Sequence, residues 1–127
     1  MHEMGLCEAV LAVVRDVSDD EPVRRVRLRV GRLQGVVPPA FDFCWRLVAQ
    51  DTGAAAAALE LTDVPVRVRC QVCGAESEPE AGAIACAACG AVSVDVVAGD
   101  ELVVEEVELE DGEVRRNPGL TATAAGS

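Results

Sequence analysis

The sequence contains Cys70-Gln71-Val72-Cys73-Gly74 and a near copy, Cys86-Ala87-Ala88-Cys89-Gly90, with twelve residues between Cys73 and Cys86. Two residues between the cysteines of each copy let a tight turn point both sulfurs at one ion, and the following glycine suits the positive φ of such turns. Four thiolates favour tetrahedral zinc or iron, and the doubled spacing favours a metal site over four unrelated buried thiols. We therefore predict that these four cysteines hold one structural zinc ion.

The predicted site has no open position for a substrate, because sulfur fills all four tetrahedral positions. Its role is therefore predicted to be structural. A redox use of one Cys-x-x-Cys motif, as in thioredoxin, is the alternative, but neither motif is expected to begin a helix in a βαβ unit. The two remaining cysteines, Cys7 and Cys44, lie on apolar helix faces and are interpreted as core residues.

The composition narrows the classes of partner. The 127 residues carry a formal net charge of -11, from 22 acidic and 11 basic residues. Because nucleic-acid binding normally needs a basic surface, we expect no nucleic-acid partner. No run reaches the roughly 18 apolar residues of a membrane span, and the start lacks the basic segment of a secretory signal. We therefore expect a cytoplasmic protein, whose reduced thiols are better explained by metal than by disulfides.

Two helices are predicted from the spacing of apolar residues. Between residues 4 and 17 apolar residues recur every three or four positions, which is typical of one helix face. A second helix is predicted to begin at Pro38-Pro39, since proline is tolerated in the first turn, and to end at Asp51-Thr52-Gly53. Its buried stripe is predicted to be Phe41, Cys44, Trp45 and Val48. The alanine run 54–58 fits either helix or strand.

Three strands are predicted from the alternation of polar and apolar residues. They lie within residues 23–33, 59–69 and 102–110, and the second runs directly into Cys70. The first strand presents arginines on one face, and the third presents glutamates. If these faces meet across the sheet, each pair of opposite charges stabilises the pairing by roughly 0.2 to 1 kcal/mol.

The predicted fold class is therefore α+β: a small, mainly antiparallel three-stranded sheet with two helices, plus an inserted zinc-ribbon-like lobe. Residues 1–69 and 93–113 are predicted to form an α/β domain, and residues 70–92 the inserted lobe. Beyond residue 113 the sequence has no apolar periodicity, so residues 114–127 are predicted to be a disordered tail.

The single histidine of the chain, His2, lies next to the start of the sequence. If Met1 keeps a free amine, that amine, the amide nitrogen of His2 and its imidazole can close adjacent chelate rings around one ion. Glu3 adds a fourth donor through its amide or carboxylate. Such a planar, nitrogen-rich set suits Ni(II) or Cu(II), whereas zinc prefers tetrahedral surroundings. The alternative is that His2 is a solvated residue near a frayed end.

Several segments taken together resemble one family. Met1-His2-Glu3-Met4 is followed by the helix with Leu6 and Ala9, by Val30-Gly31-Arg32-Leu33-Gln34-Gly35-Val36-Val37-Pro38, and by the paired Cys-x-x-Cys motifs. In this order they resemble the HypA/HybF family of nickel metallochaperones for nickel–iron hydrogenase maturation, over roughly residues 1 to 110. This resemblance favours the nickel interpretation of His2 over the solvated one.

The resemblance implies that the α/β domain carries Ni²⁺ as cargo through His2 and Glu3. It implies that the inserted lobe holds structural Zn²⁺ through Cys70, Cys73, Cys86 and Cys89. It further implies delivery to the hydrogenase large-subunit precursor with a HypB-like GTPase, and some relatives also serve urease. The sequence departs from the family in two places: Gly5 stands where a small hydroxyl residue is usual, and no histidine accompanies the zinc cysteines.

Other classes of function have less support in the sequence. The chain has no second histidine to act as a base and no glycine-rich phosphate loop, so we predict that it is not an enzyme. A zinc-ribbon adaptor with an idle N-terminus is the alternative function, and a thiol oxidoreductase is a third. The sequence leaves the oligomeric state open between monomer and dimer.

Overall fold

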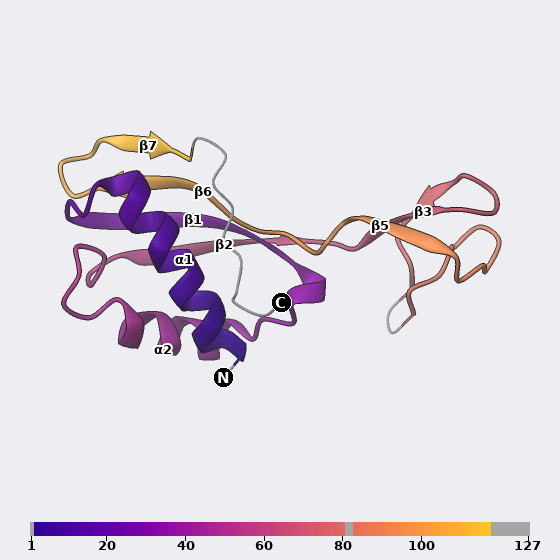
Figure 1. The fold of residues 1–127 in the computed structure, drawn as a ribbon, viewed down its shortest axis with the longest axis horizontal. Coiled ribbons are helices and arrows are strands. Elements are labelled where there is room, and N and C mark those ends of the chain that lie inside the picture. The colour runs from indigo at the N-terminus through magenta and orange to yellow at the C-terminus, as the bar shows by residue number, and fades with distance from the viewer. Residues whose placement is uncertain (1, 81–82, 118–127) are drawn as a thin grey trace. The chain divides into compact units, whose positions relative to one another are not determined.

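The computed structural model describes residues 2–80 and 83–117. The chain forms two compact units (Figure 1). Among the described residues, unit 1 comprises 2–29, 36–62 and 102–117, and unit 2 comprises 30–35, 63–80 and 83–101. The helices and antiparallel strands confirm the predicted α+β class. None of the described helices has the length and apolar character that a bilayer crossing requires.

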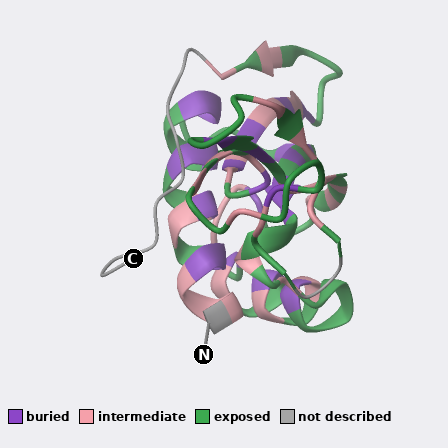
Figure 2. Cartoon of the chain, turned by 90° about the vertical axis from the view of Figure 1, so that its right-hand side faces the viewer, coloured by how far each residue is buried: buried purple, intermediate pink, exposed green. Residues whose placement is uncertain are grey.

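The first helix, α1, spans His2–Ser18. Buried and exposed residues alternate along it (Figure 2), and the buried ones follow helical spacing. They are Leu6, Cys7, Val10, Val13, Val14 and Val17. This face packs against α2 and β6. The helix ends where Asp19 and Asp20 both take positive φ, of 53° and 59°, and Arg15 Nε donates to Asp20 Oδ1 at 2.6 Å.

The second helix, α2, spans Pro38–Val48 and has proline in its first turn, as predicted. Phe41 and Trp45, one turn apart, are its buried side chains, and the Trp45 indole Nε1 donates to the Ala57 carbonyl at 3.2 Å. This bond satisfies the polar end of a ring that otherwise contributes apolar area to the core. Cys44 and Val48 are only partly buried, so the buried stripe is narrower than predicted.

The sheet that packs against these helices has four strands among the described residues, in the order β2-β1-β6-β7. The strands are β1 (Val23–Gly31), β2 (Ala58–Val64), β6 (Leu102–Leu109) and β7 (Val114–Arg116). The alanine run therefore ends in a strand, whereas residues 51–56 form turns. The core of the sheet comes from the buried residues of β1 and β6, chiefly Val26, Leu28, Val104, Val107 and Leu109.

Ion pairs cover the polar face of this sheet, as the alternation predicted. Arg27 Nη1 lies 2.9 Å from Glu106 Oε1, and Arg27 Nε lies 3.5 Å from Glu60 Oε1 on β2. Arg24, three residues earlier, pairs with Glu108, two residues later. β1 and β6 are therefore antiparallel. The two arginine side chains are 45 to 50 % exposed, so each pair stabilises the sheet by no more than about 0.2 to 1 kcal/mol.

The predicted strand 59–69 is in fact two strands in two sheets. β2 ends at Val64, and β3 (Arg67–Cys70) begins after Pro65, which has no N–H to donate to a ladder. β3 is the central strand of a second sheet, in the order β4-β3-β5. Its neighbours β4 (Glu76–Ser77) and β5 (Val94–Ala98) are both antiparallel to it. The alternation of polar and apolar residues continues through both strands, but Pro65 separates them.

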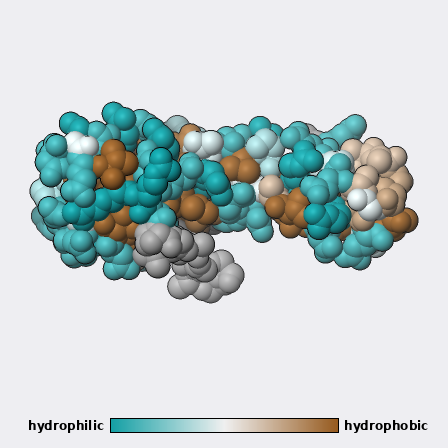
Figure 3. Space-filling view, turned by 90° about the horizontal axis from the view of Figure 1, so that it is seen from above, coloured by the Kyte–Doolittle hydropathy of each residue, from teal (hydrophilic) through white to brown (hydrophobic). Residues whose placement is uncertain are grey.

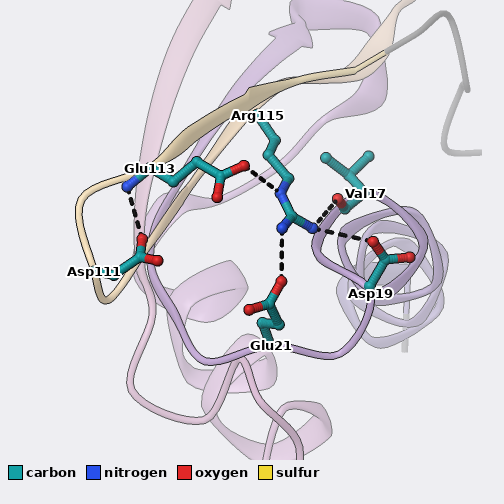
Figure 4. A network of polar contacts seen from close by, with 6 residues as sticks. All are labelled: Val17, Asp19, Glu21, Asp111, Glu113 and Arg115. Carbon is teal, nitrogen blue, oxygen red and sulfur yellow. Dashed lines mark hydrogen bonds and ion pairs between the residues drawn. The ribbon is translucent and has the colours of Figure 1, made fainter.

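β7 lies within the segment predicted to be disordered, and the contacts of Arg115 account for its order (Figure 4). The guanidinium donates to the carboxylates of Glu21 and Glu113, at 2.6 and 2.9 Å. It also donates to the Asp19 carboxylate at 3.1 Å and to the Val17 carbonyl at 3.4 Å. Hydrogen bonds with Glu113 and then Glu21 raise the pKa of Arg115. The rest of the predicted tail, 118–127, lies outside the described residues.

Replacing Arg115 by methionine is expected to lower the Tm of unit 1 by on the order of 5 °C, because three carboxylates then face one another without a cation. The neighbouring Arg116→Met is the matched control, since Arg116 is exposed and forms no ion pair among the described residues. Thermal unfolding followed by far-ultraviolet circular dichroism measures both. Equal Tm values for the two variants would show that Arg115 does not hold β7 in place.

Candidate metal centres

The four cysteines predicted to bind zinc come together in unit 2. Their sulfur atoms all lie within 4.8 Å of one another. Cys70 Sγ lies 3.6 Å from Cys89 Sγ, and Cys73 Sγ lies 3.7 Å from Cys86 Sγ. Sulfurs at the corners of a tetrahedron, each about 2.3 Å from a zinc ion, lie about 3.8 Å apart. The four-cysteine cluster therefore fits a structural zinc site.

Two matching turns hold the sulfurs, one in each Cys-x-x-Cys motif. In the first, the Cys73 backbone N–H donates to Cys70 Sγ at 3.4 Å, and the Gly74 N–H donates to the Cys70 carbonyl at 3.0 Å. In the second, the Gly90 N–H donates to the Cys86 carbonyl at 2.9 Å. The two glycines have φ of 77° and 79°. Both turns therefore use a backbone conformation in which a side chain would be strained.

Further hydrogen bonds connect each of the two turns to the sheet of unit 2. Ser77 Oγ, on β4, accepts from the Ala87 N–H of the second turn at 3.1 Å. Gln71, in the first turn, donates through Nε2 to Asp95 Oδ1 on β5 at 3.0 Å. Ser77 and Gln71 therefore support the turns that hold the cysteines, and neither residue was predicted from the sequence. The spacing of the cysteines gives no signal that would have identified them.

Backbone hydrogen bonds decide which thiols ionise most readily. The Cys89 N–H is the main cause that lowers the pKa of Cys86 to about 6, and the Cys73 N–H lowers the pKa of Cys70. The Ala91 N–H also favours the Cys89 thiolate, but the hydrogen bond with Cys70 and burial raise the pKa of Cys89 to about 11. Cys86 is thus a thiolate at neutral pH, ready to bind a cation. Metal binding then releases protons from the remaining thiols.

The same geometry disfavours the dithiol redox alternative. The hydrogen-bonded sulfur pairs, Cys70 with Cys89 and Cys73 with Cys86, each join one motif to the other. In the described part of the chain neither motif begins a helix: the first follows β3, and the second forms a turn. A thioredoxin-type cysteine obtains its low pKa within one motif at the start of a helix. The arrangement is that of ligands around a shared ion.

The predicted nickel donors lie at the start of α1. The backbone of His2 begins the helix, but Met1 and the His2 side chain lie outside the described residues. Glu3 is in the first helical turn and is partly buried. The structure therefore places the Glu3 side chain, and the Met1 amine and the His2 imidazole lie outside the described residues.

Cys7, one turn after Glu3, is buried against α2. Its thiol donates to the Phe41 carbonyl at 3.4 Å. Burial, followed by the nearby Cys44, Glu3 and Asp42, raises the pKa of Cys7 to about 12. The thiol is therefore neutral at physiological pH, as expected of the core residue that the sequence analysis predicted.

Comparison with known proteins identifies the family. A family model described as "Hydrogenase/urease nickel incorporation, metallochaperone, hypA" matches residues 1–109. The hydrogenase maturation factor HypA of Trichormus variabilis is 36 % identical over 111 residues, which cover 87 % of this chain and 97 % of the relative. The HypA of Geobacter metallireducens is 38 % identical over 110 residues, which cover 87 % of this chain and 100 % of the relative.

The fold is also similar to that of a solved structure, the solution structure of the nickel metallochaperone HypA from Helicobacter pylori. The TM-score is 0.67 at 19 % sequence identity, and the match covers 86 % of this chain and 97 % of the other. At this identity the structural match bears on the fold alone, while the family model covers most of the sequence. The chain belongs to the HypA family of hydrogenase/urease nickel-incorporation metallochaperones, as the sequence resemblance predicted.

Proposed function

We propose that this protein binds Ni(II) through His2 and Glu3 and delivers it for the maturation of nickel–iron hydrogenase. One observation carries the proposal. The only histidine of the sequence is the first residue of α1, whereas four cysteines lie together in unit 2. The four sulfur donors form one cluster with one another, which leaves the nitrogen donors of the N-terminus for a different ion.

The chemistry of the N-terminal donors suits a carrier. The amine of Met1, the amide nitrogen of His2 and its imidazole close adjacent chelate rings, and Glu3 supplies a fourth donor. Each donor can be replaced in turn by a ligand of the acceptor protein. The ion can therefore be transferred by stepwise ligand exchange and need not lose all its ligands at once. The zinc site has the opposite character, since four sulfurs and two glycine turns enclose its ion.

We further propose that different parts of the chain bind nickel and zinc. Unit 1 is the nickel domain, and unit 2, which contains residues 70–80 and 83–92 together with β3 and β5, is the zinc lobe and is structural. The protein acts in the cytoplasm without catalysing a reaction, and it works with a HypB-like GTPase to supply the hydrogenase large-subunit precursor. Membership of a nickel-incorporation family supports this assignment.

The proposal is tested by titrating nickel, with calorimetric detection, into zinc-loaded protein with its native start and into protein with Gly-Ser placed before Met1. We expect the extension to weaken nickel binding by at least about tenfold, or about 1.4 kcal/mol, because the amine no longer closes a ring with the imidazole. The zinc content should be one ion per chain in both. Equal nickel affinity would eliminate the chelate and would favour a zinc-ribbon adaptor without a nickel role.

A further inference from the structure

Unit 2 contains an apolar pocket that neither metal site uses. Its volume is about 460 Å³, within the range of pockets that bind ligands or side chains. Segments of unit 2 line it: the 3-10 helix η1 (Arg32–Gln34), the link between β2 and β3, and residues 78–80 and 83–84. The apolar residues of its wall are Leu33, Pro65, Val66, Pro79, Ala83 and Ile84. None of the four cysteines is among them.

The rim of the pocket leaves large apolar side chains in water. Leu33 is 46 % exposed and Ile84 is 45 % exposed, although each has a neighbouring apolar wall to pack against. Figure 3 shows brown apolar atoms among the hydrophilic surface of unit 2. Apolar surface that surrounds a pocket and remains exposed marks a binding site more often than a single exposed side chain does.

The charges around the pocket select the chemistry of its occupant. Arg32, on one wall, pairs with Asp63, with Nε 2.8 Å from Oδ2, so its charge is neutralised. Glu78 and Glu80, which also line the pocket, form no ion pair with any described residue. Two uncompensated carboxylates beside apolar walls favour an apolar group that has a cation next to it.

We propose that this pocket binds an apolar side chain, flanked by lysine or arginine, in a segment of a partner protein. A second copy of this chain is a poor occupant, because each copy carries a net charge of -11 and the two copies repel each other. This inference goes beyond the proposed function, since it concerns unit 2 alone and requires no nickel. It assigns to the zinc lobe a docking role in addition to its structural one.

The test uses a phage library of random seven-residue peptides, selected on the zinc-loaded full-length protein. We expect the enriched peptides to contain a leucine, isoleucine or phenylalanine beside lysine or arginine. A synthetic peptide from the enriched set should shift the NMR methyl signals of Leu33, Val66 and Ile84, and its binding should weaken as salt is added. Enrichment of acidic or uncharged peptides, or no enrichment, would overturn the proposal.

Two variants test whether the peptide binds in the pocket. Ile84→Ser and the double variant Glu78→Gln with Glu80→Gln are each expected to weaken peptide binding by about tenfold or more. Val97→Ser is the matched control, because Val97 is 41 % exposed in unit 2 but does not line the pocket. Zinc content and circular dichroism establish that each variant is folded. Equal binding by all variants, or a concentration-dependent dimer that Ile84→Ser abolishes, would contradict the assignment.

Discussion

Replacing Cys86 by serine is expected to reduce the zinc content from one ion per chain to nearly none and to unfold unit 2. The described part of unit 2 has little core of its own: apart from the cysteines Cys70 and Cys86, its only buried large apolar residues are Val30 and Val68. A unit of this size without a core relies on metal binding for its folding free energy.

Unit 1 is expected to survive the same substitution. Its core contains the buried face of α1, the aromatic residues Phe41 and Trp45, and the apolar residues of β1 and β6. None of these side chains belongs to the metal cluster. We therefore expect loss of zinc to unfold one unit and not the other.

Zinc analysis by mass spectrometry and amide NMR spectra measure this prediction. The amide signals of residues 63–80 and 83–101 should collapse into the narrow range of an unfolded chain, while those of α1 stay dispersed. Cys44→Ser is the control, because Cys44 is partly buried and lies outside the cluster. Dispersed unit 2 signals in a zinc-free Cys86→Ser protein would show that the lobe folds without its ion.

Replacing His2 by alanine is expected to lower the affinity for nickel by at least about 100-fold, or about 2.7 kcal/mol. The substitution removes the imidazole and with it one chelate ring, so the amine and amide that remain cannot enclose the ion. Zinc content and Tm should not change, because the buried face of α1 begins at Leu6 and the zinc ligands lie in unit 2.

Glu3→Gln is the graded comparison for this variant. It keeps the backbone amide and removes only the carboxylate, so we expect a loss of about tenfold or less. Glu8→Gln is the control for the change of charge, since Glu8 is an exposed residue further along α1. Nickel titration of the four proteins should rank them with the wild type and Glu8→Gln tightest and His2→Ala weakest. Undiminished nickel binding by His2→Ala would place the donors elsewhere.

Much of the fold could be predicted because it is encoded locally. The apolar spacing of α1, the prolines that begin α2 and the alternating arginines of β1 each follow from neighbours in the sequence. β7 could not be predicted in this way. It has no apolar pattern, and its order depends on Arg115 meeting Asp19 and Glu21, which lie more than 90 positions away.

The candidate sites likewise contain parts that are encoded locally and parts that depend on contacts between distant residues. The spacing of the four cysteines predicts the zinc site, because a single short turn holds each pair. Ser77 and Gln71 support those turns through Ala87 and Asp95, which lie 10 and 24 positions away in the sequence. No motif specifies these separations. The pocket of unit 2 was missed for the same reason, since separate segments assemble it.

We propose that two kinds of metal site coexist in one chain: a closed sulfur site for zinc and an open nitrogen-rich site for nickel. X-ray absorption at the zinc and nickel edges of protein loaded with one ion of each tests it most directly. We expect four sulfurs at about 2.3 Å around zinc and only nitrogen and oxygen around nickel. Sulfur in the nickel shell, or a zinc shell in which nitrogen or oxygen replaces sulfur, would contradict the account.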